Sequence, residues 1–248
     1  MRYWRMTTIA AMVLALGLAG GCHQNKVPEG TVKSEVFEDD APAEKAPAEE
    51  AMPEEAAPAE TPAEAPAEAA AEAPAETAEA PAADAVYVIS PNDDSFIEFV
   101  GYKVTGNQPG GFANFSGEVT VPGGDLTKAQ VSVKVDLTTV YTKTNILTET
   151  LKGKDFFEIG TFPEASFTST EITQDGDGYK VVGNFDLHGF SKKIGFPAKI
   201  EMKDGNVVAS AEFSIDRNLW EISYDGVTDD AIRDDVLIKF EVVAEPQA

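Results

Sequence analysis

Residues 131–137 read Val-Ser-Val-Lys-Val-Asp-Leu, and residues 236–242 read Val-Leu-Ile-Lys-Phe-Glu-Val. In both stretches every second residue is apolar, so these side chains share one side of an extended chain. A period of two is typical of an antiparallel strand with one face in the core and the other in water. The two stretches therefore predict a β-sheet protein.

The C-terminal part of the chain continues this pattern. Six more strand candidates lie at residues 95–104, 112–121, 165–173, 180–187, 193–202 and 207–215. Turn-forming sequences separate several of them, at residues 122–125, 175–178 and 204–206. One long interruption, at residues 144–162, predicts a short helix near 145–152 and then a loop rich in Phe. Eight short strands predict an all-β fold, either a sandwich or a closed antiparallel eight-stranded barrel whose interior fits one ligand.

The composition excludes several classes of function. The chain of 248 residues has 43 acidic and 19 basic residues, which argues against binding nucleic acid or anionic headgroups through a basic surface. One Cys and two His rule out a disulfide framework and a zinc site of Cys and His. The acidic residues lack the spacing of an EF-hand loop, so no metal is expected. This applies to Asp175 with Asp177 and to the group Asp225, Asp229, Asp230, Asp234 and Asp235.

The N-terminus has the pattern of an export signal. Arg2 and Arg5 precede an apolar stretch at residues 9–18, which is too short to span a membrane but suits a signal peptide. The sequence Leu18-Ala19-Gly20-Gly21-Cys22 resembles the bacterial lipobox, and this resemblance implies a signal peptide at residues 1–21 and a lipid anchor on Cys22. In lipoproteins of this kind, an Asp directly after the Cys usually means retention in the inner membrane. His23 occupies that position here, so the resemblance implies the outer membrane, with the protein facing the periplasm. The alternative is an ordinary cleaved signal with an incidental Cys.

A linker is predicted at residues 22–85. Units of Ala-Pro-Ala-Glu recur there, and residues 35–84 contain 16 acidic residues against Lys45 alone. Frequent Pro, like charges and few large apolar side chains favour a disordered, extended chain. We interpret the linker as a spacer between the membrane and a folded domain at residues 86–248, although a partner-binding role for the repeats stays open.

Four sequence blocks in the folded domain are similar to those of the YceI-like family. They are Gly110-Gly111-Phe112-Ala113-Asn114-Phe115-Ser116-Gly117, Leu151-Lys152-Gly153-Lys154-Asp155-Phe156-Phe157-Glu158 with the following Phe162-Pro163 and Phe167-Thr168-Ser169-Thr170, Gly183-Asn184-Phe185-Asp186-Leu187-His188-Gly189-Phe190-Ser191-Lys192, and Asp216-Arg217 with Ile232-Arg233-Asp234-Asp235-Val236. The blocks occur in the family's order, from Tyr87 to Ala244. Gly153 stands where the family usually has Ser, and Gln108 where related lipoproteins often have His.

The resemblance implies a lipocalin-like barrel that binds a polyisoprenoid, such as a polyprenyl chain or a quinone tail, as carrier or reservoir. Eight Phe are candidates for the wall of an apolar tunnel, namely Phe112, Phe115, Phe156, Phe157, Phe162, Phe167, Phe185 and Phe213. Any one of them also fits an ordinary core position. The competing hypothesis is therefore a structural or stress-protective envelope lipoprotein without a ligand.

Catalysis is not expected. His188 is the only His of the folded domain, and Asp186 and Ser191 lie near it in sequence, but there is no Gly-x-Ser-x-Gly elbow. We interpret His188 as a hydrogen-bonded residue of a turn, and Asp216 with Arg217 as an ion pair or turn lock. No catalytic residue and no cofactor other than a bound isoprenoid is predicted.

Overall fold

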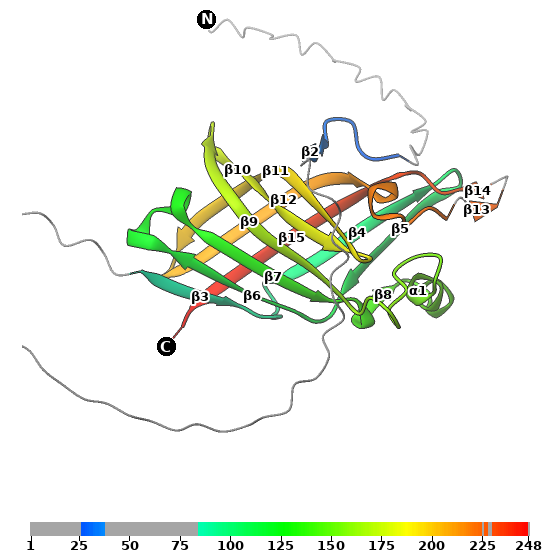
Figure 1. Ribbon diagram of the computed structural model, residues 1–248, viewed down its shortest axis with the longest axis horizontal. Coiled ribbons are helices and arrows are strands. Elements are labelled where there is room, and N and C mark those ends of the chain that lie inside the picture. The colour runs from blue at the N-terminus through cyan, green and yellow to red at the C-terminus, as the bar shows by residue number, and fades with distance from the viewer. Residues whose placement is uncertain (1–25, 38–83, 225, 228–229, 248) are drawn as a thin grey trace, which may run out of the picture.

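A computed structural model describes residues 26–37, 84–224, 226–227 and 230–247 (Figure 1). The expected signal peptide, Cys22 and residues 38–83 of the expected linker lie outside the described residues. Among the described residues, no helix is both long and apolar enough to cross a membrane.

Five long strands form more than half of the barrel wall. They are β9 (Glu164–Asp175), β10 (Gly178–Leu187), β11 (Phe190–Lys203), β12 (Asn206–Asp216) and β15 (Asp235–Pro246). Tight turns join β9 to β10 and β11 to β12, and Gly176 and Gly205 in these turns have φ of 58° and 84°. Positive φ favours glycine, which explains why the turn sequences separate the strands so clearly.

The remaining wall consists of strands in two segments each. β3 (Ala85–Ile89) and β4 (Phe96–Lys103) both pair with β15, one after the other. Next to them, β5 (Gly106–Phe112) pairs with β4, and β6 (Phe115–Val121) pairs with β3. Likewise β7 (Gln130–Asp136) pairs with β6, and the short β8 (Val140–Thr142) with β5. The strand order is therefore set by neighbouring hairpins.

The sheet closes on itself. The order β12–β11–β10–β9–β7–β6–β3–β15 ends where it begins, because β15 also pairs with β12 from Val207↔Ala244 to Asp216↔Asp235. All these pairs are antiparallel, so the expected all-β, closed eight-stranded barrel is confirmed. The expected helix is also present, as α1 (Asn145–Lys152).

The strand predictions missed β3, β5 and β8. β5 has the sequence Gly-Asn-Gln-Pro-Gly-Gly-Phe, which is typical of a loop. It is nevertheless a strand, because β4 and β8 supply hydrogen-bonding partners on its two edges. The expected strand at 112–121 is in fact two segments, which meet between Phe112 and Phe115.

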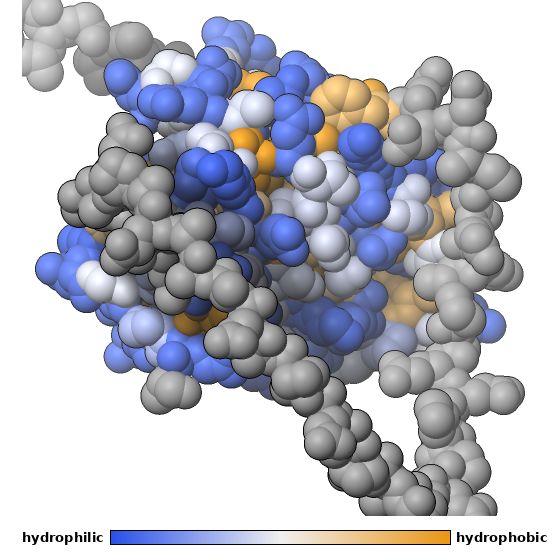
Figure 2. Space-filling view, turned by 60° about the vertical axis from the view of Figure 1, so that its left-hand side comes forward, coloured by the Kyte–Doolittle hydropathy of each residue, from blue (hydrophilic) through white to orange (hydrophobic). Residues whose placement is uncertain are grey.

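The end of the barrel beyond β4 and β5 is built from short elements. A 3-10 turn (Arg217–Trp220) follows β12, and the small strands β13 (Gly226–Val227) and β14 (Asp230–Ala231) pair with each other. Figure 1 shows α1 at the same end of the barrel. Figure 2 shows that hydrophilic side chains dominate the outer face in view, with hydrophobic residues in small separate areas. The apolar residues of the alternating strands therefore gather inside.

One expectation about the linker is corrected. Val32–Lys33 (β1) and Glu35–Phe37 (β2) were expected to be disordered, yet β1 pairs with β12 and β2 pairs with β11. Residues 31–37 are called the strap below. The strap contains two Val and one Phe and no Pro, which fits an extended chain, and the Pro-rich repeats begin only after it.

Candidate functional site

The barrel encloses an apolar cavity of about 270 Å³. This volume is near the lower end of the range of ~300–1,000 Å³ typical of ligand pockets. Almost every lining residue is aliphatic or aromatic, and the charged residues among them are Glu98 and Arg217. The cavity therefore offers contact area but few hydrogen-bonding groups.

The period of two explains how the strands make this lining. Along β11, the cavity-lining residues are Ile194, Phe196, Ala198 and Ile200, and along β15 they are Val236, Ile238, Phe240, Val242 and Ala244. Each set occupies alternate positions, so the intervening residues face outward. The same alternation that predicts the fold thus builds the site.

Three aromatic rings meet near one end of the cavity. Phe99 from β4 lies 5.6 Å from Phe112 of β5, measured between ring centroids, and 6.3 Å from Phe157. Phe112 and Phe157 are 5.9 Å apart. Such tilted and edge-on contacts are favourable geometries for aromatic pairs. Phe157 belongs to the loop after α1, so this loop forms part of the cavity wall.

Local interactions of α1 and its loop hold Phe157 in place. The Thr144 side chain caps α1 by accepting a hydrogen bond from the Leu147 amide at 3.3 Å. After the helix, the Phe157 amide donates to the Leu151 carbonyl at 3.0 Å. Leu151 and Phe156 are buried in the main core. The loop is therefore an ordered part of the barrel end.

Six of the eight Phe predicted from sequence line the cavity. They are Phe112, Phe156, Phe157, Phe167, Phe185 and Phe213. The other two lie elsewhere, because Phe115 packs in the second core cluster with Ile89 and Val121, and the Phe162 ring packs 5.0 Å from His188. Their expected contact with a ligand in this cavity is therefore not supported by their positions.

Sequence reasoning missed several aromatic lining residues. Phe99, Phe196 and Phe240 all line the cavity from strand interiors. The prediction favoured Phe residues in or near loops, although Phe196 and Phe240 also occupy the apolar positions of alternating stretches. The alternation of apolar and polar residues along the strands is the sequence signal that identifies Phe196 and Phe240.

His188 is held as a turn residue. Its φ is 51°, and its Nδ1 lies 3.0 Å from the Trp220 carbonyl oxygen. Because a carbonyl only accepts, Nδ1 carries the proton in this contact. The other nitrogen, Nε2, is 3.7 Å from Glu158, and Asp186 instead accepts a hydrogen bond from the Ser166 hydroxyl at 3.0 Å. His188, Asp186 and Ser191 therefore do not have the arrangement of a hydrolase triad.

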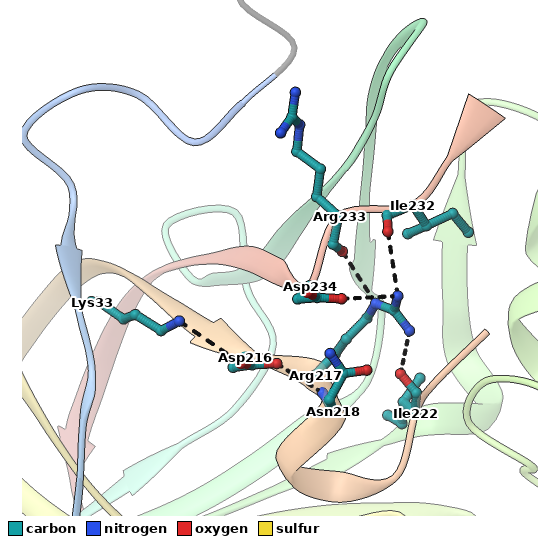
Figure 3. A network of polar contacts seen from close by, with 8 residues as sticks. All are labelled: Lys33, Asp216, Arg217, Asn218, Ile222, Ile232, Arg233 and Asp234. Atoms are coloured by element: carbon teal, nitrogen blue, oxygen red, sulfur yellow. Dashed lines mark hydrogen bonds and ion pairs between the residues drawn. The ribbon is translucent and has the colours of Figure 1, made fainter. Parts of the chain in front are cut away.

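Arg217 is buried and bonded mostly to backbone (Figure 3). Its Nε donates to the Arg233 carbonyl at 3.1 Å, and its other nitrogens donate to the carbonyls of Ile222 and Ile232. Asp234 is 3.5 Å away, whereas Asp216 accepts from the Asn218 amide at 3.1 Å. Asp216 and Arg217 therefore stabilise the turn after β12 through separate hydrogen bonds and do not form an ion pair with each other.

Burial shifts the pKa of two tyrosines in the barrel. Burial raises the pKa of Tyr102, with a smaller contribution from Glu212. Burial also raises the pKa of Tyr141, which lies near Glu98. Both phenols therefore stay neutral at physiological pH. Among the described residues, no group of three or more His, Cys, Asp or Glu is placed to hold a metal ion.

Comparisons with known proteins agree with this architecture. The UPF0312 protein of Yersinia pestis (strain Pestoides F) is 31% identical over 128 residues, covering 50% of this chain and 65% of that protein. The chain thus matches slightly less than two thirds of the length of such relatives. The UPF0312 protein of Yersinia enterocolitica has the same identity and coverage.

Two solved structures share the fold. Burkholderia cenocepacia BcnA has a TM-score of 0.56 and 21% identity, over 60% of this chain and 95% of its own. A polyisoprenoid binding domain from Saccharophagus degradans, implicated in plant cell wall breakdown, has a TM-score of 0.53 and 17% identity, over 64% and 98%. The sequence pattern of the YceI-like domain matches residues 87–244. The chain therefore belongs to the YceI-like family.

Proposed function

We propose that this protein binds an isoprenoid-type lipid, with the hydrocarbon chain inside the barrel, and serves as a carrier or reservoir in the cell envelope. The observation that carries this proposal is the continuous apolar lining of a cavity enclosed by the barrel. An apolar cavity with so few polar groups disfavours water and favours a hydrocarbon. The polyisoprenoid-binding domain with a similar fold supports the same choice.

The proposal includes an anchor. Cys22 is the acylation point suggested by the lipobox-like sequence, and it would hold the mature protein on the outer membrane, facing the periplasm. No catalytic step is proposed. His188 and Arg217 act in this proposal as structural residues, because backbone carbonyls already engage the His188 Nδ1 atom and three nitrogens of the Arg217 side chain.

The test is a quantitative lipid extraction. Wild type, Phe157→Asp and Phe96→Asp are purified from one host, and isoprenoid per mole of folded protein is measured by mass spectrometry. Phe157 is a half-buried residue of the lining, so a carboxylate there costs several kcal/mol in contact with hydrocarbon. Phe96 of β4 is the matched control, because it does not line the cavity and its ring instead lies beneath the Lys239 amine of β15.

We expect wild type and Phe96→Asp to retain the lipid and Phe157→Asp to lose it. Clean extracts from wild type produced in several hosts would instead support the structural, ligand-free alternative. His188→Gln is expected to retain the lipid. Loss of lipid in His188→Gln, with full retention in Phe157→Asp, would move the site to the turn around His188.

A further inference from the structure

The barrel wall lacks a continuous strand ladder between β11 and β12. β11 and β12 pair with each other only from Lys199↔Ser210 to Lys203↔Asn206. Beyond this register, β11 still pairs with β10 along its length, and β12 with β15. The two strands therefore separate toward the end of the barrel that carries α1 and the 3-10 turn, and the strap occupies the space between them.

The strap replaces the missing pairing. Val32 and Lys33 lie beside Phe213 and Ser214 of β12, and the Ser34 amide donates to the Ser214 carbonyl at 2.8 Å. Glu35, Val36 and Phe37 then lie beside β11, with Phe37 opposite Lys193. Each edge of the gap thus has a hydrogen-bonded neighbour.

Side chains fasten the strap on the outer surface. Lys33 forms an ion pair with Asp235 at 2.7 Å. Its amine also lies 3.9 Å from the Asp216 carboxylate (Figure 3). On the other side, Lys180 forms an ion pair with Glu35 and lies over the Phe37 ring. These groups come from β10, β12 and β15, so the strap connects three barrel strands.

The cavity begins directly behind the strap. Ile194 and Phe196 of β11 and Phe213 and Ile215 of β12 all line it. The rings of Phe196 and Phe213 stack across the gap, with centroids 4.2 Å apart and an angle of 6° between planes. Only side chains, and no ladder between β11 and β12, therefore separate the strap from the cavity.

We infer that the gap between β11 and β12 is the lateral entrance through which the hydrocarbon chain reaches the cavity, and that the strap is its removable closure. This inference rests on the proposed function. The strap pairs first with the edge of β12 and then with the edge of β11, so its departure leaves both edges unpaired and opens a space between them. An isoprenoid chain can enter the cavity through this space from the side of the barrel once the stacked rings of Phe196 and Phe213 rotate away from each other.

The strap is also the part of the wall that is easiest to detach. β1 and β2 contain two and three residues, whereas β11 contains 14. Val32, Val36 and Phe37 stay 50%, 37% and 37% exposed, so a substantial part of the strap's apolar surface remains in water even when it is docked. Segments with few buried contacts open at a lower free energy than the whole domain.

The decisive experiment locks the strap. Cys22 is the only Cys, so Cys22→Ser gives a cysteine-free background in the full chain. Phe37→Cys and Lys193→Cys are introduced together into this background, because the two residues lie opposite each other on β2 and β11 and can form a disulfide. The matched control is Glu118→Cys with Ser132→Cys, an exposed pair between β6 and β7. Uptake of labelled decaprenol from phosphatidylcholine vesicles is measured with each disulfide oxidised and then reduced.

We expect the oxidised strap pair to take up decaprenol at least about tenfold more slowly than its reduced form, because opening is blocked. The control pair should show no change. Ser34→Pro, which removes the amide donated to Ser214, should accelerate uptake, whereas Ser34→Ala should not.

The outcomes separate the two proposals. Equal rates in the oxidised and reduced strap pair, or equal rates in Ser34→Pro and Ser34→Ala, would overturn the lateral entrance and leave lipid binding intact. Failure of every variant and of the Cys22→Ser background to take up decaprenol would overturn both.

Discussion

Single glycines decide how the aromatic lining fits. A Cβ added to Gly110 on β5 would lie 2.5 Å from the Phe99 ring and 2.7 Å from the Tyr141 carbonyl oxygen. Likewise, a Cβ added to Gly183 on β10 would lie 2.5 Å from the Phe167 ring on β9. Both distances are far below van der Waals contact, so the absence of a side chain makes room for a lining ring on the neighbouring strand.

Gly110→Ala should therefore displace Phe99 and disturb the cavity. We expect a loss of about 1–3 kcal/mol in the free energy of unfolding, the usual cost of overpacking, together with less extracted lipid. Gly106→Ala is the control, since a Cβ there meets nothing within 4 Å. Urea denaturation measures the first effect, and equal stability of the two variants would contradict this account.

Arg217 provides a second prediction at this scale. Arg217→Met keeps much of the side-chain length but leaves the carbonyls of Ile222, Ile232 and Arg233 without their donors. We expect a destabilisation of at least about 2 kcal/mol, because each buried carbonyl left without a donor costs roughly 1–3 kcal/mol. Lys134→Gln, which removes an exposed ion pair with Glu164, should cost less than ~1 kcal/mol.

At the scale of elements, alternation and turn chemistry predicted most of the wall and α1. β5 and β8 escaped prediction because their stability comes from neighbouring strands and not from their own residues. The strap escaped for the same reason, since nothing within residues 31–37 indicates the gap that they fill. The cavity lining was predicted only in part, because contacts such as Phe115 with the second core cluster depend on strand orientation.

The strap and the Ala-Pro-Ala-Glu repeats should contribute differently to the thermal stability of the barrel. Deleting residues 31–37 should lower the Tm, by roughly 2–4 °C for each kcal/mol of lost docking energy. Deleting residues 46–76 should leave the Tm unchanged, because the repeats have few large apolar side chains, and the 16 residues left between the strap and β3 still span up to ~50 Å. A large drop from the second deletion would mean that the repeats also dock on the barrel.

At the scale of the whole molecule, the proposed attachment to the membrane depends on one atom, the sulfur of Cys22. Cys22 supplies the only thiol of the chain. Cys22→Ser should therefore move the protein from the membrane fraction to the soluble fraction, as measured by carbonate extraction and immunoblotting. Wild type processed in parallel is the control. Membrane association of Cys22→Ser that resists carbonate would contradict the anchor.

The docked strap also changes how far the barrel can stand from its anchor. While the strap is docked, only residues 22–31 lie between Cys22 and the wall, which limits the separation to about 35 Å. Once it detaches, residues 22–84 are available and the limit rises to about 220 Å. In the proposed mechanism a single event therefore opens the barrel and lengthens its tether. In this proposal, a barrel with its strap docked stays near the membrane that carries the anchor, and a barrel with its strap detached reaches further into the envelope to exchange its lipid.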